Sequence, residues 1–192
     1  MNRDIVIASN NKDKIKEVQE ILNDYNIISI GELGIKINVK EDKDTFEANA
    51  IKKAKSIAKK INGEMCIADD SGIEIQYLNG FPGVKTKRWL EGTDRERNLA
   101  ILKKLEGIPK KERRVTFITA IALSDGVFTI SAVSNIEGYI ANTIRGKNGF
   151  GFDEIFELEN GKTLAELSEE EKNNISSRRK ALEQIKSKLL EK

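Results

Sequence analysis

The sequence predicts an α/β fold, with a mixed β-sheet flanked by helices, from three observations. Short apolar runs alternate along the chain with segments whose apolar residues recur at helical spacing. Residues 114–123 and 127–133 are rich in β-branched side chains and flank a Ser-Asp-Gly turn, which predicts a hairpin in the same sheet. Polar clusters directly follow two apolar runs, as at the strand ends where α/β sheets bind ligands. With 192 residues and no internal repeat, we expect one domain over 1–192, with room for two lobes around a cleft.

The composition excludes several classes of chemistry. The chain has 33 Lys and Arg, 31 Asp and Glu, one cysteine and no histidine, so Ser-His-Asp and Cys-His schemes and histidine-ligated metals are excluded. Catalysis would then depend on carboxylates, lysines, arginines, hydroxyls or a hard cation. The net charge of +2 argues against nucleic-acid binding through overall positive charge alone. Because the cysteine is alone and no long apolar run occurs, we expect a cytoplasmic protein without a membrane segment.

The first part of the chain predicts alternating strands and helices. Residues 5–8 form a short apolar strand, and apolar residues recur at helical spacing over 15–22. Residues 27–30 predict a second buried strand, whereas 31–43 show no sustained period and are expected to form a loop. A helix is predicted over 45–61, because one apolar stripe runs along it and an Asn-Gly pair follows it.

Two pairs of residues have the spacing of a capping box at a helix start. Asp44 and Glu47 lie at the start of the helix predicted over 45–61. Thr93 and Glu96 start a further helix that stops near a Gly-Ile-Pro segment. We expect the buried stripe of that helix to consist of Leu99, Leu102 and Leu105.

The second part of the chain predicts further strands and a helical end. Residues 65–68 predict a buried strand that ends in a polar turn at 69–72, and the alternation over 73–77 predicts another strand. Residues 136–140 extend the sheet, and the chain after the glycine-rich stretch at 146–153 is expected to be helical. The expected buried stripe of the last helix consists of Leu182, Ile185 and Leu189. Its N-cap is expected at Ser176 or Ser177.

The first polar cluster lies between the first strand and the first helix. It consists of Ser9, Asn10, Asn11, Lys12, Asp13 and Lys14. Backbone N–H groups and the helix dipole favour an anion such as phosphate there, and a lysine adds a full positive charge. The segment lacks the Gly-x-x-x-x-Gly-Lys-Ser/Thr spacing of a P-loop. The alternative is an ordinary capped helix with solvated lysines, which the local pattern alone favours.

The second polar cluster is the Asp-Asp-Ser-Gly segment at 69–72. Adjacent residues of an extended chain point to opposite sides, so one carboxylate can face a cleft while the other pairs structurally. A carboxylate in a cleft can bind Mg²⁺ or orient a water molecule. The alternative is an Asp-rich turn that leads into a hairpin.

Two further clusters lie toward the C-terminus. The glycine-rich stretch could present the ring of Phe150 to a planar base, while Asp153 accepts hydrogen bonds from the base edge. The alternative is a tight loop whose phenylalanines pack into the core, which we prefer for Phe156. Lys172 and the Ser-Ser-Arg-Arg segment at 176–179 could bind carbonyl or phosphate oxygens, or could be charges on a solvated helix face.

Taken together, these segments resemble the Ham1-like inosine triphosphate pyrophosphatase family along nearly the whole chain. Six fragments in the family's order carry the resemblance: Ser9 to Lys14 with the pattern Ser/Thr-x-Asn-x-x-Lys, Thr45-Phe46 with Asn49-Ala50, Ala68 to Gly72, Gly80 to Gly83 with Arg88, Gly149 to Asp153, and the pairs Lys162-Thr163, Ala165-Glu166, Glu171-Lys172 and Ile175-Ser176 with Arg178. The resemblance implies a curved mixed sheet flanked by helices, two lobes with the active site in the cleft between them, and a homodimer. It also implies Mg²⁺-dependent hydrolysis of ITP, dITP and XTP to the nucleoside monophosphate and pyrophosphate, which would cleanse the nucleotide pool.

The resemblance further implies a role for individual residues. Asp70 is expected to be the catalytic carboxylate and to bind the metal together with Glu41. The expected substrate-binding residues are Ser9, Asn10, Asn11, Lys12, Asp13 and Lys14, then Lys53 and Ser71, and, around the base, Phe150, Gly151, Phe152, Asp153, Lys172, Ser177 and Arg178. Ser177 stands where the family typically has a histidine, so the degree of base selectivity stays open.

Two alternatives to this function stay open at this point. The chain could be a nucleotide pyrophosphatase with a broader range or one that acts on modified pyrimidines. From a different class, it could be a non-catalytic nucleotide or nucleic-acid binding module, which the basic last helix and Lys85, Lys87 and Arg88 suggest. We expect a nucleoside triphosphate rather than a stable nucleic acid as partner, because a pure binder has little use for a carboxylate such as Asp70 beside phosphates.

Overall fold

The strands form one mixed sheet in the order β2-β1-β3-β5-β6-β7, and β4 pairs with β3 outside this path. The computed structural model describes residues 3–36 and 39–190. The strands of this part of the chain are β1 (Arg3–Ile7), β2 (Tyr25–Ser29), β3 (Cys66–Ile75), β4 (Phe81–Pro82), β5 (Arg114–Ser124), β6 (Thr129–Ile140) and β7 (Phe156–Glu157). Its α-helices are α1 (Lys12–Ile21), α2 (Phe46–Lys60), α3 (Asp94–Lys104), α4 (Glu169–Ile175) and α5 (Ser177–Leu190).

The strands pair in both directions, so the predicted α/β class with a mixed sheet is confirmed. β1 is parallel to β2 and to β3, with Val6 opposite Cys66. β4 is antiparallel to β3, and β7 is antiparallel to β6. β5 and β6 are sheet neighbours joined by the short turn at 125–128, as the predicted hairpin requires. The strand extension predicted at 136–140 is the second half of β6.

The chain divides into two compact units, and β3, β5 and β6 each continue from one unit into the other. Unit 1 comprises Met1–Asp70, Thr119–Ser134 and Arg178–Lys192. Unit 2 comprises Ser71–Ile118 and Asn135–Ser177. Each unit has a hydrophobic core of its own.

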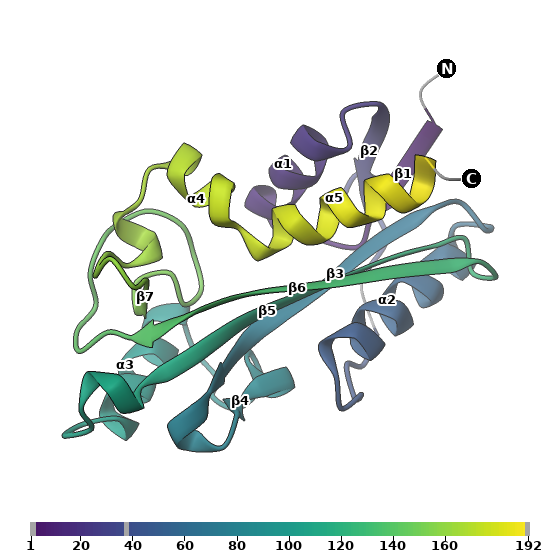
Figure 1. Cartoon of the computed structure of the whole chain (residues 1–192). Coiled ribbons are helices and arrows are strands. Elements are labelled where there is room, and N and C mark those ends of the chain that lie inside the picture. Colours follow the sequence, from purple (N-terminus) through teal and green to yellow (C-terminus); the bar gives the residue numbers. More distant parts are fainter. Residues whose placement is uncertain (1–2, 37–38, 191–192) are drawn as a thin grey trace. The chain divides into compact units, whose positions relative to one another are not determined.

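Unit 1 has helices on both faces of its strands. Figure 1 shows α1 and α5 on one side of these strands and α2 on the other. Leu22 and Leu182 are completely buried in the core with Ile67 of β3. Ala50 and Ala54 of α2 are also completely buried, as the apolar stripe of this helix predicts. Each large apolar side chain buried in this way stabilises the fold by about 1.5–3 kcal/mol.

Unit 2 is built around α3, β7 and the distal parts of the long strands. Ile101 of α3, Ile75 of β3 and Phe156 of β7 are completely buried in one cluster. The preferred interpretation of Phe156 as a core residue is therefore confirmed. Phe152 of the glycine-rich stretch belongs to the same cluster and is 5% exposed.

The turn predicted within β3 is wrong. β3 runs without interruption through 69–72, where the sequence predicted a polar turn between two strands. The strand lies between β1 and β5 in the sheet, and this pairing overrides the local turn preference of aspartate and glycine. The second predicted strand, at 73–77, also ends early, because Tyr77 lies in a 3₁₀ turn over Gln76–Leu78.

The start of α2 differs from the prediction by one residue. Its N-cap is Thr45, whose hydroxyl oxygen accepts a hydrogen bond from the backbone N–H of Ala48 at 3.1 Å, so Asp44 is not the cap. Glu47, predicted to complete the capping box, instead accepts a hydrogen bond from the Ser131 hydroxyl at 2.7 Å. A contact with a distant strand thus replaces the local one.

The start of α3 is as predicted, but its expected buried stripe is confirmed only in part. Thr93 and Glu96 form the predicted capping box. Leu105 is completely buried and Leu102 packs against the core of unit 2, as expected. Leu99, however, is 51% exposed, whereas Asn98 and Ile101 are completely buried. The helix is therefore rotated so that a polar residue faces inward, which apolar periodicity alone does not predict.

The segment after the glycine-rich stretch is not entirely helical, which corrects that prediction. β7 and a 3₁₀ turn over Leu164–Glu166 precede α4. α4 begins with a capping box of Ser168 and Glu171, and α5 begins at Ser177, directly after Ser176. The start of the last helix is thus where the sequence predicted it.

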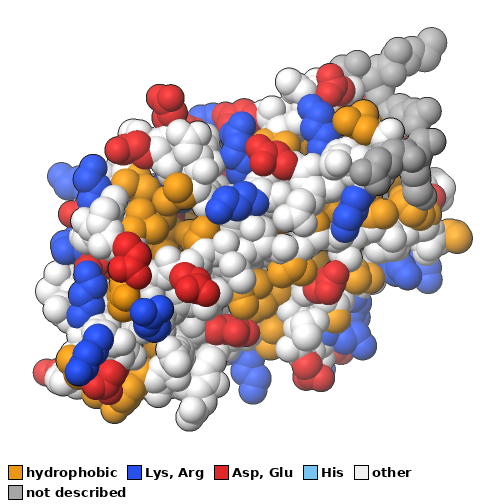
Figure 2. Space-filling model, in the orientation of Figure 1, with side chains coloured by type: hydrophobic (Ala, Val, Ile, Leu, Met, Phe, Trp, Pro, Cys, Tyr) orange, Lys and Arg blue, Asp and Glu red, His pale blue; other side chains and the backbone are white. Residues whose placement is uncertain are grey.

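The surface carries both signs of charge side by side. Figure 2 shows Lys and Arg side chains interspersed with Asp and Glu side chains on the face that it displays. This agrees with the small net charge of +2. Within residues 3–36 and 39–190, no helix has the length and apolar character needed to cross a membrane.

Candidate functional site

The first group of site residues in unit 1 surrounds Asp69 of β3. Lys14 Nζ donates to Asp69 Oδ2 at 2.6 Å, and Arg178 Nη2 lies 3.5 Å from the same oxygen. Arg178 Nη1 donates to Glu17 Oε2 at 2.8 Å. Burial alone would raise the pKa of Asp69, but Lys14, Arg178 and Lys53 outweigh it and hold the pKa well below its usual range. Asp69 is therefore an ionised, structural partner for buried cations.

Lys14 comes from the first turn of α1, which the predicted polar cluster caps. Asn11 Oδ1 accepts from the backbone N–H groups of Asp13 at 2.9 Å and Lys14 at 3.3 Å. Ser9 Oγ accepts from Asn11 N at 3.1 Å. The capping interpretation is thus confirmed for Asn11. Burial lowers the pKa of Lys14, and the charge of Asp69 opposes this effect.

The other members of this cluster are at the surface. Asn10, Lys12 and Asp13 are exposed. The side chain of Asn10 lies against Gly31, where an added Cβ would meet Asn10 Oδ1 at 2.7 Å. Gly31 therefore leaves room for the turn that follows β1.

Asp70, the next residue of β3, has different surroundings. The side chain of Asn49, from α2, hydrogen-bonds Asp70, whereas Asp70 Oδ2 is buried and has no hydrogen-bond partner among the described residues. Burial raises the pKa of Asp70 to about 6, and the charge of Glu41 acts in the same direction. Lys53 and Asn49 partly oppose both effects. The strand thus holds one carboxylate whose pKa is lowered and, next to it, one whose pKa is raised to about 6.

Lys53 of α2 bonds both the backbone of Asp69 and the carboxylate of Glu41. Its Nζ donates to the backbone oxygen of Asp69 at 2.9 Å and forms an ion pair with Glu41. Burial alone would lower the pKa of Lys53, but the charges of Asp69 and Glu41 raise it. The structure therefore brings together the predicted residues Lys53, Glu41 and Asp70 within unit 1.

Asp70 and Glu41 form a pair of carboxylates rather than a complete metal cage. Within 3–36 and 39–190, no group of three or more Asp, Glu or Cys side chains has the arrangement of a metal site. Mg²⁺ is commonly held by one or two carboxylates together with substrate phosphates and water. The unpartnered oxygen of Asp70 fits such a role.

The second group of site residues is the glycine-rich loop of unit 2. Asp153 Oδ2 accepts from the backbone N–H of Phe150 at 2.8 Å and from Lys172 Nζ at 2.6 Å. The ammonium of Lys172 lies 4.9 Å from the centre of the Phe150 ring. Gly149 has φ +77°, and a Cβ there would meet Asp153 Oδ2 at 2.0 Å, so the loop requires glycine at this position.

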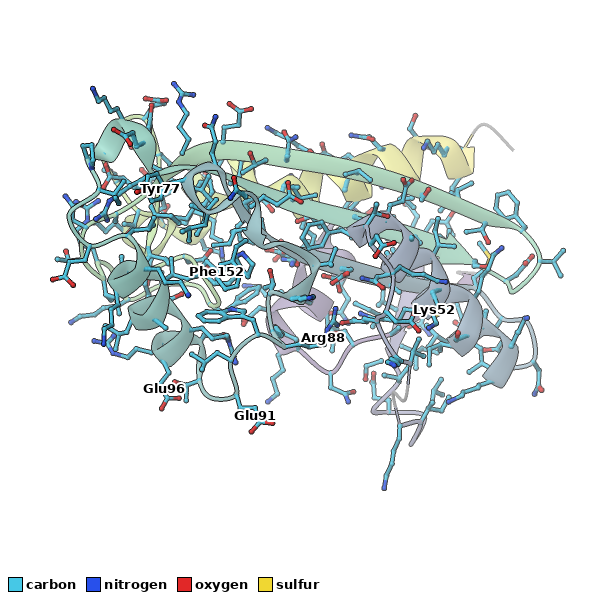
Figure 3. The ribbon with its side chains drawn as sticks, turned by 90° about the horizontal axis from the view of Figure 1, so that it is seen from below. Lys52, Tyr77, Arg88, Glu91, Glu96 and Phe152 are labelled. Atoms are coloured by element: carbon cyan, nitrogen blue, oxygen red, sulfur yellow. The ribbon has the colours of Figure 1, made fainter. Side chains whose placement is uncertain are left out.

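The remaining predicted site residues have varied surroundings. Phe152 packs in the core of unit 2, and Figure 3 shows it among the inner side chains of that unit. Ser71 is half-buried in β3, and Ser177 is 4% exposed at the start of α5. Arg178, predicted at the base, directs its two Nη atoms to Glu17 and Asp69 in unit 1.

Sequence reasoning assigned no role to four residues that hold these groups. Asn49 is completely buried and bonds Asp70, and Glu17 pairs with Arg178. Asp94 and Asn98 of α3 bond the backbone of Gly151. A signal existed for Asn49 and Asn98, because each is a polar residue beside the apolar stripe of a predicted helix. No local pattern identifies Glu17 or Asp94.

Comparisons with known proteins give consistent matches over nearly the whole chain. The model of the Ham1 family matches residues 5–188. The dITP/XTP pyrophosphatase of Clostridium perfringens is 43% identical over 96% of both chains, and that of Bacillus subtilis is 44% identical over 98% of both. A HAM1 protein from Coxiella burnetii has a similar solved structure, with TM-score 0.89 and 39% identity over 99% of this chain and 100% of that one. The Staphylococcus aureus Ham1 protein follows with TM-score 0.87 and 39% identity over 97% and 98% of the two chains.

Proposed function

The chain belongs to the Ham1 family, and from this premise we propose that it hydrolyses the deaminated purine nucleotides ITP, dITP and XTP to the nucleoside monophosphate and pyrophosphate. The observation that carries the proposal is that Asp70 Oδ2 is buried and has no hydrogen-bond partner among the described residues. The positive charge of Lys53 favours the ionised form of this carboxylate. Cleaving a phosphoanhydride requires charge neutralisation and an oriented water rather than covalent help. A carboxylate, lysines and a hard cation supply these without histidine.

We assign Mg²⁺ to the carboxylates of Asp70 and Glu41. The fit rests on the unpartnered oxygen of Asp70 and on the proximity of Glu41, whose charge helps to raise the pKa of Asp70. Hard oxygen ligands of this kind suit Mg²⁺. When bound, the ion would neutralise phosphate charge and acidify a bound water.

We assign the triphosphate to the lysines of unit 1, with Ser9 and Asn11 at the start of α1. Lys14 is held by Asp69, and Lys53 is held by Asp69 O and Glu41, so both ammonium groups have fixed positions before substrate binds. Preorganised charges in a partly buried site stabilise a transition state more strongly than solvated charges do. In this scheme the ionised Asp70 orients the attacking water and accepts its proton as the bond between the α- and β-phosphates breaks.

We assign the base to the glycine-rich loop of unit 2. The ring of Phe150 would stack on the purine, and Lys172 offers N–H groups beside that ring. Placing the amino group of adenine against a buried donor, where inosine has a keto oxygen, costs about 1–3 kcal/mol. The guanidinium of Arg178 is paired with Glu17 and Asp69. To contact the base, it would have to release one of these carboxylates and bind the substrate in its place.

A product-resolved assay tests the function directly. With Mg²⁺ present, ITP should yield IMP and pyrophosphate, much faster than ATP yields AMP and pyrophosphate. Release of single phosphates, or no turnover of ITP, would contradict the proposal. We also propose a homodimer, which light scattering during size-exclusion chromatography tests.

One observation supports a broader substrate range as the second candidate. Ser177 replaces the histidine typical of the family, so base discrimination could be weaker here. A panel of ITP, XTP, ATP, GTP and methylated pyrimidine triphosphates separates the two candidates. A nucleic-acid binding module would instead show salt-dependent affinity for DNA or RNA, whereas a flat salt response would remove that alternative.

A further inference from the structure

Helix α3 holds the loop that carries Phe150 and Asp153. The backbone N–H of Gly151 donates to Asp94 Oδ2 at 3.1 Å. The backbone oxygen of Gly151 accepts from Asn98 Nδ2 at 2.9 Å. Asp94 and Asn98 are four residues apart on α3, so their side chains lie on the same face. Both backbone groups of one loop glycine thus bind a single helix face.

The two hydrogen bonds to Gly151 hold the backbone of this loop in place. Its φ of +66° lies in the left-handed region that favours glycine. Its N–H belongs to the peptide shared with Phe150, and its carbonyl belongs to the peptide shared with Phe152. Fixing both peptide planes fixes the directions of the flanking rings, which place Phe152 in the core of unit 2 and Phe150 beside Lys172.

The two α3 side chains are themselves held in place. Arg97 Nη2 donates to Asp94 Oδ1 at 2.7 Å, and Arg97 Nη1 donates to the backbone oxygen of Gly92 at 2.7 Å. Asn98 is completely buried, and its Nδ2 also lies 3.4 Å from Glu154 Oε2. Side chains with fixed partners can set the geometry of a loop rather than follow it.

We propose that Asp94 and Asn98 are positioning residues for base recognition, which set the place of the Phe150 ring and thereby the preference for a 6-keto over a 6-amino purine. The inference rests on the proposed function, in which this loop contacts the base. Both residues bond the loop backbone, whereas the proposed phosphate and metal ligands belong to unit 1. Loosening the loop should therefore raise KM and reduce base preference while kcat at saturation is unchanged.

The test variant is Asp94→Ala, which removes the acceptor for the Gly151 N–H. The Asp94 side chain is 41% exposed, so the fold should tolerate its loss. Glu91→Ala is the matched control, because it removes the same charge three residues earlier from an exposed side chain that points outward in Figure 3. Asp94→Asn keeps an oxygen acceptor without the charge and should rescue the effect of Asp94→Ala.

The first readout is the ratio of kcat/KM for ITP to that for ATP. For Asp94→Ala we expect this ratio to fall about three- to tenfold, as for loss of one hydrogen bond, through a higher KM for ITP. Glu91→Ala and Asp94→Asn should retain the ratio of the unmodified protein. An equal fall in Glu91→Ala, or no rescue by Asn, would overturn the proposal, because the effect would then follow charge rather than the bond to Gly151.

The second readout is amide hydrogen exchange of a peptide covering 149–153, which requires no activity. Exchange there should be faster in Asp94→Ala than in the unmodified protein and in Glu91→Ala. Unchanged exchange in Asp94→Ala would overturn the positioning role. If the unmodified protein releases no IMP from ITP, the proposed function fails, whereas the exchange result still decides whether α3 holds the loop.

Discussion

Lys14 Nζ lies 2.6 Å from Asp69 Oδ2, although the two residues are 55 positions apart and belong to α1 and β3. Both side chains are mostly buried, at 15% and 9% exposure. Arg178 lies 3.5 Å from the same carboxylate and also pairs with Glu17, so two carboxylates and two cations form one ion-pair network inside unit 1. The stability of this unit therefore depends on the charge of Asp69.

Asp69→Ala should lower the free energy of unfolding by about 3–5 kcal/mol, because it leaves the mostly buried ammonium of Lys14 without its carboxylate partner. Urea-induced unfolding measures the change. Asp24→Ala is the control, since its ion pair with Lys186 involves a side chain that is 70% exposed, and such pairs contribute about 0–1 kcal/mol. If the two substitutions changed the free energy of unfolding equally, the buried ion pair would contribute no more to stability than the exposed one.

Asp70→Asn should reduce kcat by about 10²–10⁴-fold with the fold intact, because it removes the carboxylate proposed to accept the proton. Steady-state turnover of ITP and circular dichroism measure the two effects. Near-normal turnover would contradict the catalytic role.

The same substitution should stabilise the metal-free protein above pH 6. Burial raises the pKa of Asp70 to about 6 in the folded state, compared with about 3.9 in an unfolded chain. The folded state is therefore increasingly disfavoured as pH rises from about 4 to about 6, and Asp70→Asn removes this penalty of at most about 3 kcal/mol. Thermal unfolding in EDTA should show a higher Tm for Asp70→Asn at pH 7.5 and an equal Tm near pH 3.5. A lower Tm at pH 7.5 would contradict the pKa assignment.

Mg²⁺ should raise the Tm of the unmodified protein without nucleotide, because binding to the folded state stabilises it. The shift should be smaller in Glu41→Gln and absent in Asp70→Asn. Glu64→Gln, at an exposed position, provides the control and should retain the full shift. An undiminished shift in Asp70→Asn would place the ion elsewhere.

Ser177→His should increase the preference for ITP over ATP if a histidine at this position helps to read the base. Because Ser177 is 4% exposed, the larger ring could cost about 1–3 kcal/mol of stability through overpacking. Ser177→Ala separates loss of the hydroxyl from gain of the ring. An unchanged preference in Ser177→His would mean that other groups of the loop already discriminate the bases.

The parts of the fold that sequence predicts correctly depend on local chemistry. The capping box of Thr93 and Glu96 and the hairpin around 124–126 each require only nearby residues, and both are present. The continuity of β3 through 69–72 depends on pairing with neighbouring strands, so a local turn signal misled the prediction.

For the site, too, the sequence predicted candidate residues but not the contacts between distant parts of the chain. The sequence identified Lys14, Asp70 and Glu41 as candidates, but it did not predict that Lys14 would pair with Asp69. That pairing depends on the parallel contact between β1 and β3, which brings the turn after β1 beside Asp69. The anchoring of Gly151 by α3 was missed for a similar reason, because it joins residues 53 and 57 positions apart.

The uninterrupted course of β3 also limits which changes in chain length this protein can tolerate. Asp69 and Asp70 are successive residues of one strand and therefore point to opposite faces of the sheet. Inserting or deleting one residue between Cys66 and Asp69 would exchange those faces for every later side chain of the strand. The carboxylate of Asp69 would then leave the face on which it pairs with Lys14. The spacing within this strand therefore determines the face to which each aspartate points.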